Sequence, residues 1–190
     1  KSETSNKENT LFHLFTKYNA DLDFENFIES SLNISIQKVN NDTYLKIFDT
    51  NIVDTDLKPE NFDTLTSDIE LNLENEKFSL NGGFSAYEDL SKLNSDRYQY
   101  VLPYYNFSKN FFDNNNFGSF NFLSQGDNIL KDTNSLRSRM INNLNIQSYD
   151  FISKNGIKNN FNYYLKNTIT AGKNNVEYDS SPHVKLMNIL

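Results

Sequence analysis

The sequence predicts an all-β fold, an antiparallel up-and-down meander. Apolar and polar residues alternate with a period of two along several stretches, Asn-rich turns separate these stretches, and no segment shows convincing helical periodicity. A period of two places apolar side chains on one face of a sheet and polar side chains on the other. The predicted sheet therefore has two chemically different faces.

The chain begins with a short apolar and aromatic strand over residues 11–18 and an alternating strand over residues 31–37. The Asn-Asn-Asp sequence at 40–42 supplies residues that tolerate the left-handed conformations of turns. We therefore expect residues 43–49 to return as the partner strand. Residues 50–64, which include four acidic residues, form a predicted long loop.

The clearest signal is a hairpin over residues 65–87. Its strands are joined by Asn75-Glu76-Lys77, a spacer short enough for a β-turn. Gly82 and Gly83 lie within the second strand and lack any phosphate-loop context, so close packing or a bend explains them best. The alternating apolar positions are Ile69, Leu71, Leu73, Phe78, Leu80, Phe84 and Ala86.

The second half of the chain continues the alternation, with a loop over residues 89–96 and a turn at 113–116. Ile141 interrupts the pattern of its strand. Proline is tolerated only at a strand start, an edge or a bulge, and we expect Pro103 and Pro182 to begin strands. The predicted strands cover residues 97–109, 117–128, 136–147 and 161–165, with a last strand near Pro182.

Composition narrows the function classes. The formal charge of −7 and the pI of about 4.8 argue against nucleic acid as a partner, because phosphate contacts need clustered Lys and Arg. The absence of Cys excludes disulfides, thiolate metal sites and Cys nucleophiles. Lys1 is not an initiator Met, no signal segment follows it, and Leu190 lies in an alternating stretch. We therefore expect residues 1–190 to be one part of a larger domain.

The pattern favours a fragment of a large outer-membrane transmembrane β-barrel in a Gram-negative bacterium. Mean hydropathy is −0.67, yet the chain has 16 Phe and 11 Tyr, as expected of a sheet with one wet face. The apolar runs fall far below the roughly 18 residues that a membrane-spanning helix needs, so insertion would use strands. Short turns at 40–42, 75–77 and 113–116 would lie on one rim, and longer loops at 50–64, 89–96 and 131–135 on the other.

The wall of such a barrel separates lipid from an aqueous lumen. Polar positions of the alternation would line the lumen, and apolar positions would contact lipid. We expect the lumen-facing residues to be Asp68, Glu70, Asn72, Arg137, Arg139, Asn143 and Lys166. We expect the lipid-facing residues to be Ile34, Ile69, Leu71, Leu80, Phe120, Leu144 and Leu165.

Groups of residues that could suggest chemistry have simpler explanations. His13 and His183 have no third metal ligand or nearby nucleophile pattern, so a structural or surface role is preferred. Arg137 and Arg139 could contact sugar phosphates, but charged lumen lining without a specific ligand is preferred. Acidic loop residues lack the spacing and the Gly of a calcium site and are expected to be solvated. These are Asp21, Asp23, Glu25, Asp54 and Asp56.

Two function classes stay open on this pattern: a lipid-translocating membrane barrel, and a secreted or surface-exposed soluble β-domain for glycan binding or adhesion. A soluble β-sandwich would show the same alternation and the same turns. Aromatic residues near strand ends fit either class, as an interfacial girdle, which is preferred, or as a carbohydrate-stacking surface. They are Tyr98, Tyr100, Tyr104, Tyr105, Phe111, Phe112, Tyr163 and Tyr164.

Several segments resemble one family, in the family's order. Residues 42–49 (DTYLKIFD), 98–108 (YQYVLPYYNFS), 118–122 (GSFNF), 132–134 (DTN) and 150–167 look like segments of LptD, the LPS-assembly protein of the outer membrane, also known as OstA or organic solvent tolerance protein. The resemblance extends over about residues 11–190 and rests on strand and turn segments, not on catalytic signatures.

The resemblance implies a translocon and not an enzyme. LptD is a very large barrel, plugged by the lipoprotein LptE, that receives lipopolysaccharide from a periplasmic bridge and inserts it into the outer leaflet. The implied partners are lipopolysaccharide, an LptE-like plug, an LptA-like periplasmic bridge and outer-membrane lipid, and no cofactor is implied. This chain would form part of the barrel wall, with the periplasmic domain and the remaining strands outside residues 1–190.

Overall fold

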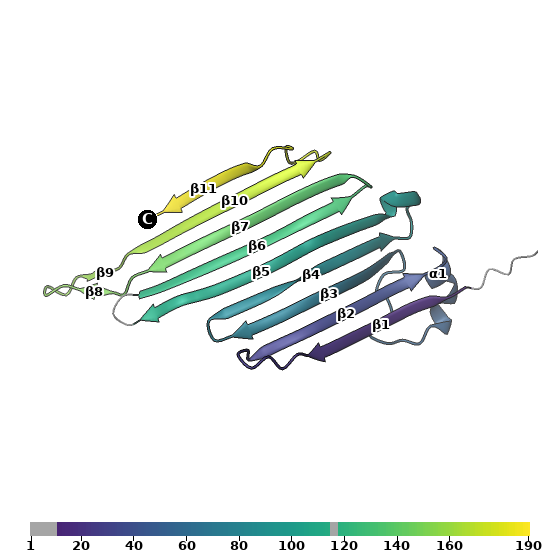
Figure 1. The fold of residues 1–190 in the computed structure, drawn as a ribbon, viewed down its shortest axis with the longest axis horizontal. Helices are drawn as coiled ribbons and strands as arrows, with labels where there is room; N and C mark the ends of the chain where they lie inside the picture. The colour runs from purple at the N-terminus through teal and green to yellow at the C-terminus, as the bar shows by residue number, and fades with distance from the viewer. Residues whose placement is uncertain (1–10, 115–117) are drawn as a thin grey trace, which may run out of the picture.

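The computed structural model describes residues 11–114 and 118–190 (Figure 1). Most of them form one nine-stranded antiparallel sheet, in the order β1-β2-β3-β4-β5-β6-β7-β10-β11. Each strand pairs with the next in the chain, except that a small hairpin, β8–β9, stands between β7 and β10. This arrangement confirms the predicted all-β antiparallel meander.

The strands of the sheet are β1 (His13–Asp21), β2 (Glu29–Val39), β3 (Thr64–Asn75), β4 (Phe78–Asp89), β5 (Tyr98–Asn114), β6 (Gly118–Lys131), β7 (Ser135–Gln147), β10 (Asn162–Lys173) and β11 (His183–Ile189). The remaining elements are the α-helix α1 (Tyr44–Phe48), the 3-10 helices η1 (Asp49–Asn51) and η2 (Asn94–Arg97), and the hairpin strands β8 (Phe151–Ile152) and β9 (Lys158–Asn159).

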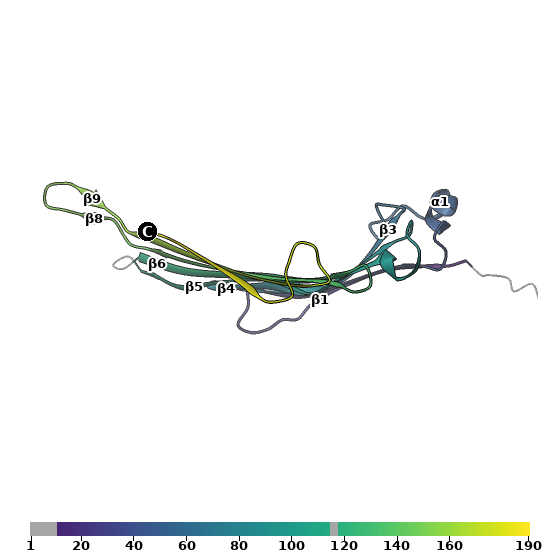
Figure 2. The ribbon, with the colours of Figure 1, turned by 90° about the horizontal axis from the view of Figure 1, so that it is seen from above.

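The sheet is a single layer (Figures 1 and 2). Seen edge-on, α1 and the loop that joins β10 to β11 lie on one side of it, and neither extends over the middle of the sheet. Buried apolar residues among those described are confined to the α1 end: Val39, Leu45, Leu65 and Leu90. In the described part of the chain, no second sheet therefore packs on this one to make a dry interior.

The prediction of a strand over residues 43–49 is wrong, because this segment forms α1 and η1. The amide of Ile47 donates to the carbonyl of Thr43 at 3.0 Å, and the rings of Tyr44 and Phe48 lie 5.0 Å apart, one helical turn from each other. Leu45 is fully buried, whereas Ile47 is exposed. The apolar residues of this segment therefore follow a helical period, and β3, not this segment, pairs with β2.

The α1 segment lies where β2 and β3 separate. Their paired register ends at Ser35 and Asp68. Beyond that point, side chains replace backbone partners: the amide of Gln37 donates to Ser67 Oγ at 3.0 Å, and the amide of Thr66 donates to Gln37 Oε1 at 2.9 Å. These bonds satisfy backbone groups that the divergence of the two strands would otherwise leave unpaired.

The hairpin predicted over residues 65–87 is confirmed, and its register runs from Thr64 opposite Asp89 to Asn75 opposite Phe78. Pro182 directly precedes β11, as expected. Pro103, however, does not begin a strand. It lies inside β5, where the register with both neighbouring strands shifts between Val101 and Tyr104. A bulge accommodates the missing N–H of proline within the strand.

The arrangement of the connections at the two ends of the strands differs in part from the prediction. The Asn-Asn-Asp turn at 40–42 lies at the same end as the loops at 50–64, 89–96 and 131–135, because residues 43–49 do not form a returning strand (Figure 1). The turn at 75–77 lies at the opposite end. Of the turn predicted at 113–116, the first two residues end β5 and residues 115–116 lie outside the described part.

The β8–β9 hairpin was not predicted, and it makes a long connection at the end where short turns were expected. Asp150 lies next to β8, and Lys158 of β9 donates a hydrogen bond to its carboxylate, with Nζ and Oδ2 2.7 Å apart. This hydrogen bond lowers the pKa of the Asp150 carboxyl. None of the described helices is long and apolar enough to cross a membrane.

Candidate functional site

The register of the sheet sorts its side chains onto two faces, because residues directly opposite on neighbouring strands point the same way. Ile34 pairs with Ile69, and Leu144 pairs with Leu165. We call this side the apolar face, and it contains every residue predicted to face lipid: Ile34, Ile69, Leu71, Leu80, Phe120, Leu144 and Leu165.

The opposite side, the polar face, contains every residue predicted to line the lumen: Asp68, Glu70, Asn72, Arg137, Arg139, Asn143 and Lys166. Ile141, which interrupts the alternation, also lies on the polar face, opposite Thr168. The register therefore places these residues on one face of the sheet, across strands that are distant in the chain.

The apolar face is open to its surroundings. Ile69 is 46% exposed and Phe84 is 48% exposed, although both lie on interior strands of the sheet. Within a folded domain, such residues would normally be covered by another layer. A continuous apolar surface of this kind marks a site that contacts lipid or another apolar partner.

Aromatic rings form a band on the apolar face near the β3–β4 turn. Phe107 contacts Phe78 and Phe122, with ring centroids 5.2 and 6.0 Å apart, and Phe120 contacts Phe111 and Phe112. At the opposite end of β5, Tyr98 and Tyr100 stack on the same face, 6.0 Å apart. Rings thus gather near both ends of the strands on this face, as they do on the outer surface of membrane barrels.

Two residues of the predicted girdle lie elsewhere. Tyr104 and Tyr164 are on the polar face, where the Tyr104 hydroxyl donates to Glu70 at 3.2 Å and the Tyr164 hydroxyl donates to Asn143 at 3.0 Å. The bulge at Pro103 adds a residue to β5, and each of the two is adjacent in sequence to a tyrosine on the apolar face. Tyrosines that are neighbours in the sequence therefore do not all lie on the same face of the sheet.

Gly83 makes the contact between Tyr104 and Glu70 possible. It stands between these residues in one cross-strand row, and a Cβ on it would collide with the backbone carbonyl of Ile69 and approach the Tyr104 hydroxyl to 3.0 Å. The ring of Tyr104 can thus extend over the glycine toward the carboxylate. Close packing, one of the two explanations expected for Gly82 and Gly83, is what the structure shows.

A row of polar groups that satisfy each other crosses the apolar face from β5 to β10. The Ser124 hydroxyl lies 3.1 Å from the Tyr105 hydroxyl and donates to Asn142 at 2.6 Å, and Asn142 donates to Asn167 at 3.3 Å. Ser124 is buried. Mutual hydrogen bonding lowers the cost of placing hydroxyl and amide groups among apolar side chains.

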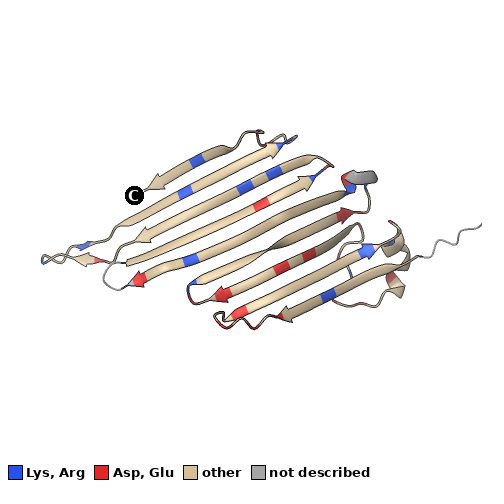
Figure 3. Cartoon of the chain, in the orientation of Figure 1, with Lys and Arg blue, Asp and Glu red and all other residues tan. Residues whose placement is uncertain are grey.

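Asp and Glu prevail on β1 to β4, and Lys and Arg prevail on β5 to β11 (Figure 3). The register shows which of these residues lie on the polar face. The acidic half, over β1 to β4, carries Asp21, Glu29, Asp68, Glu70, Glu74 and Asp89, with Lys17 as its cation. The basic half, over β5 to β11, carries Lys131, Arg137, Arg139, Lys166 and Lys185, with Asp113 and Asp127 as the anions of its strands. A ligand with separated charges would be oriented by such a surface.

Asp127 holds both arginines of the basic half. Arg139 donates to it through Nη2 at 2.9 Å and Nε at 3.1 Å, and Arg137 approaches it at 3.5 Å. Both Arg139 donors reach the same oxygen, Asp127 Oδ1, and together they fix the orientation of the guanidinium. The two arginines that the sequence singled out are therefore already paired with a carboxylate, on a strand whose contribution the sequence did not indicate.

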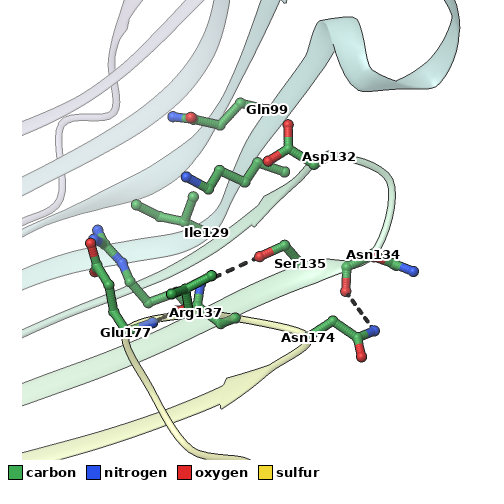
Figure 4. A pocket seen from close by; sticks show the side chains of 11 residues that line it. Gln99, Ile129, Asp132, Asn134, Ser135, Arg137, Asn174 and Glu177 are labelled. Carbon is green, nitrogen blue, oxygen red and sulfur yellow. Dashed lines mark hydrogen bonds and ion pairs between the residues drawn. The ribbon is translucent and has the colours of Figure 1, made fainter.

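The β10–β11 loop crosses the polar face as a strap, defined here as residues 174–182. Asn174 donates to the carbonyl of Asn134 at 3.3 Å, Asn175 donates to Ser135, and Glu177 pairs with Arg137 at 3.8 Å (Figure 4). A pocket of about 490 Å³ lies between the strap and the β6–β7 turn. Its lining residues include Gln99, Ile129, Lys131, Asp132, Arg137 and Val176.

The other candidate residues have local roles or no partner of note. His13 lies 2.8 Å from the Tyr44 hydroxyl and stacks on Phe15, so it helps to hold the α1 segment. His183 lies on β11 at the polar face. In the described ranges, no three His, Cys, Asp or Glu side chains gather as a metal site. At the α1 end, the hydrogen bond to Asp42 raises the pKa of Arg97.

The site is therefore a surface and not a cleft: a single-layer sheet with an open apolar face, a charged polar face and a strap across one end of the latter. Comparison of the chain with protein-family models, with curated proteins and with solved structures gives no match.

Proposed function

We propose that this chain forms part of the wall of an outer-membrane β-barrel, with its apolar face toward lipid and its polar face toward an aqueous lumen. The observation that carries the proposal is the uncovered apolar face of a single-layer antiparallel sheet. In lipid, backbone groups must pair within the protein, which a ladder of strands achieves along its length. Rings near the strand ends and a hydrogen-bonded polar row fit the same environment.

We further propose that the barrel is a lipopolysaccharide translocon of the LptD kind. The support is the resemblance of residues 98–108 and the other segments to that family, together with a wall that offers separate surfaces to acyl chains and to charged sugars. The proposed partners are lipopolysaccharide, an LptE-like plug and an LptA-like periplasmic bridge. A photo-crosslinking residue at Asn143, on the polar face, is expected to capture lipopolysaccharide in outer membranes, and one at Leu144 to capture phospholipid or lipopolysaccharide acyl chains only.

Whether the chain needs a membrane-like environment to fold tests the proposal that it forms a membrane wall. The chain is expected to acquire its β signal in circular dichroism in detergent micelles or bilayers and not in plain buffer. Leu71→Arg should impair assembly, since Arg at the lipid-facing midplane costs about 2–4 kcal/mol. Asp68→Asn, on the polar face of the same strand, is the matched control and should assemble normally.

A folded monomer in plain buffer, with equal tolerance of both substitutions, would overturn the membrane wall. That outcome would favour a soluble β-domain for glycan binding or adhesion instead.

A further inference from the structure

On the polar face, a groove of about 490 Å³ lies beside the strap and is distinct from the pocket of Figure 4 in most of its lining. Its floor consists of strand residues of β7, β10 and β11, and its overhanging wall is the strap. The lining residues are Arg139, Ile141, Lys166, Thr168, Thr170, Glu177, Tyr178, Asp179, His183 and Lys185.

The floor of the groove is rich in hydrogen-bond donors. Lys185 is directly opposite Thr168 on the neighbouring strand, and Lys166 is two residues from Thr168 on the same face. Diagonal neighbours of this kind have Cα atoms about 7–8 Å apart, within reach of long side chains. The two ammonium groups can therefore converge above the Thr168 hydroxyl.

These two lysines differ from the arginines in their pairing. Arg137 and Arg139 are neutralised in part by Asp127, whereas Lys166 and Lys185 make no ion pair or hydrogen bond with any residue of 11–114 or 118–190. The carboxylates of the groove belong to the strap, and Glu177 is engaged by Arg137. Two unpaired cations beside hydroxyl donors match an oxygen-rich anion that accepts bonds from several directions.

We propose that this groove binds a phosphate monoester carried by a saccharide. The phosphate lies between Lys166 and Lys185 and accepts from Thr168, while Arg139, held by Asp127, borders the site. A volume of about 490 Å³ far exceeds that of a bare phosphate and suits a sugar phosphate. Tyr178 lines the groove on the strap side and offers an aromatic side chain for packing on the saccharide. The inference deepens the proposed function but rests on the polar face alone.

The full chain, folded in micelles at low salt, is titrated calorimetrically with glucose 6-phosphate, with glucose and with inorganic phosphate. We expect binding of glucose 6-phosphate, weaker binding of inorganic phosphate and none of glucose. The double variant Lys166→Gln/Lys185→Gln should lose at least about tenfold in affinity, because each charged hydrogen bond contributes strongly. Asp179→Asn, which removes a carboxylate from the strap, should strengthen binding.

Lys17→Gln is the matched control, since it removes an ammonium from the acidic half of the same face. It should change the affinity less than about twofold, and the circular dichroism of every variant should match that of the parent chain. A second arm uses mixed micelles of a phosphorylated glycolipid or of its dephosphorylated form. Selective binding of either phosphorylated probe supports the site and identifies the source of the phosphate as soluble or lipid-bound.

Equal binding of phosphorylated and unphosphorylated probes, or an equal loss in the Lys17 variant and the double variant, would overturn the site. If the chain folds in plain buffer, which would contradict the membrane wall, the same titration is made there. The phosphate site is then tested independently of the proposed membrane location.

Discussion

At the scale of single residues, position in a cross-strand row decides what each side chain does. Glu70, Gly83, Tyr104, Asp127 and Arg139 follow one another across five strands of the polar face. Glycine in the middle of a strand usually weakens it, and here it gives Tyr104 room to reach Glu70. The row shows how residues that are far apart in the sequence share one local environment.

Gly83→Ala should lower the free energy of unfolding in micelles by about 1–3 kcal/mol, because its methyl group would collide with the backbone carbonyl of Ile69. Gly82→Ala is the matched control. Its Cβ would stand 3.1 Å from the Tyr104 carbonyl, a tight contact that small shifts can relieve. Urea midpoints compare the two variants, and an equal loss in both would contradict the special role of Gly83.

Acid should open the β8–β9 hairpin locally. Because the ion pair with Lys158 lowers the pKa of Asp150 below its ordinary value of 3.8, the carboxylate stabilises the hairpin at higher pH, and this contribution is lost as the pH falls through the lowered pKa. Hydrogen exchange of the hairpin amides, followed between neutral pH and pH values below 3.8, should show that loss. Asp150→Asn should be less protected at neutral pH and show little further change on acidification.

At the scale of elements, the strands were predictable and the irregular segments were not. Alternation is a local signal, and it was enough to predict the hairpin over residues 65–87. It was also enough to predict which residues of β6, β7 and β10 lie on the same face. The α1 segment was mistaken for a strand because its helical apolar period is only about one turn long. The bulge that moves Tyr104 to the polar face depends on the pairing of β5 with both neighbours. Pro103 was compatible with a bulge, but the sequence alone could not distinguish a bulge from a strand start.

The α1 segment should be held mainly by Leu45. Leu45→Ala removes a fully buried side chain and should lower the stability of the segment by about 2–5 kcal/mol. Ile47→Ala, in the same helix but at a position 62% exposed, is the control and should have little effect. Limited proteolysis within residues 50–63, together with urea unfolding, measures the difference. Equal protease sensitivity of the two variants would show that the burial of Leu45 is not what anchors the segment.

At the scale of the whole molecule, the two faces make a prediction that spans all nine strands. The chain has no Cys, so single cysteines can be introduced and labelled with an environment-sensitive fluorophore. Labels at Ile34, Leu71 and Leu165 should be quenched by a nitroxide carried on lipid acyl chains, and labels at the adjacent Asn33, Asn72 and Lys166 should not. Equal quenching of the labels at neighbouring positions would contradict a wall that faces lipid on one side only.

The sequence was sufficient for the antiparallel all-β meander and for grouping the alternating residues of its regular strands by face, since both follow from a period of two. It was not sufficient for the face of Tyr104 or Tyr164. It was not sufficient for the groove beside the strap. Asp127, Lys185 and Tyr178 lie on three different segments, and only the register brings them near Arg139 and Lys166. The division of charge between β1–β4 and β5–β11 was likewise visible only after the strands were ordered.

The directions of the two edge strands, β1 and β11, decide whether a closed form of this sheet needs an odd or an even number of added strands. With nine strands in an antiparallel meander, β1 and β11 run in the same direction (Figure 1). Joining β11 directly to β1 would create a parallel pair in an otherwise antiparallel cylinder, whereas an even number of strands keeps every pair antiparallel. A closed barrel in which every pair is antiparallel would therefore need an odd number of additional strands between these two edges, whichever polypeptide supplied them.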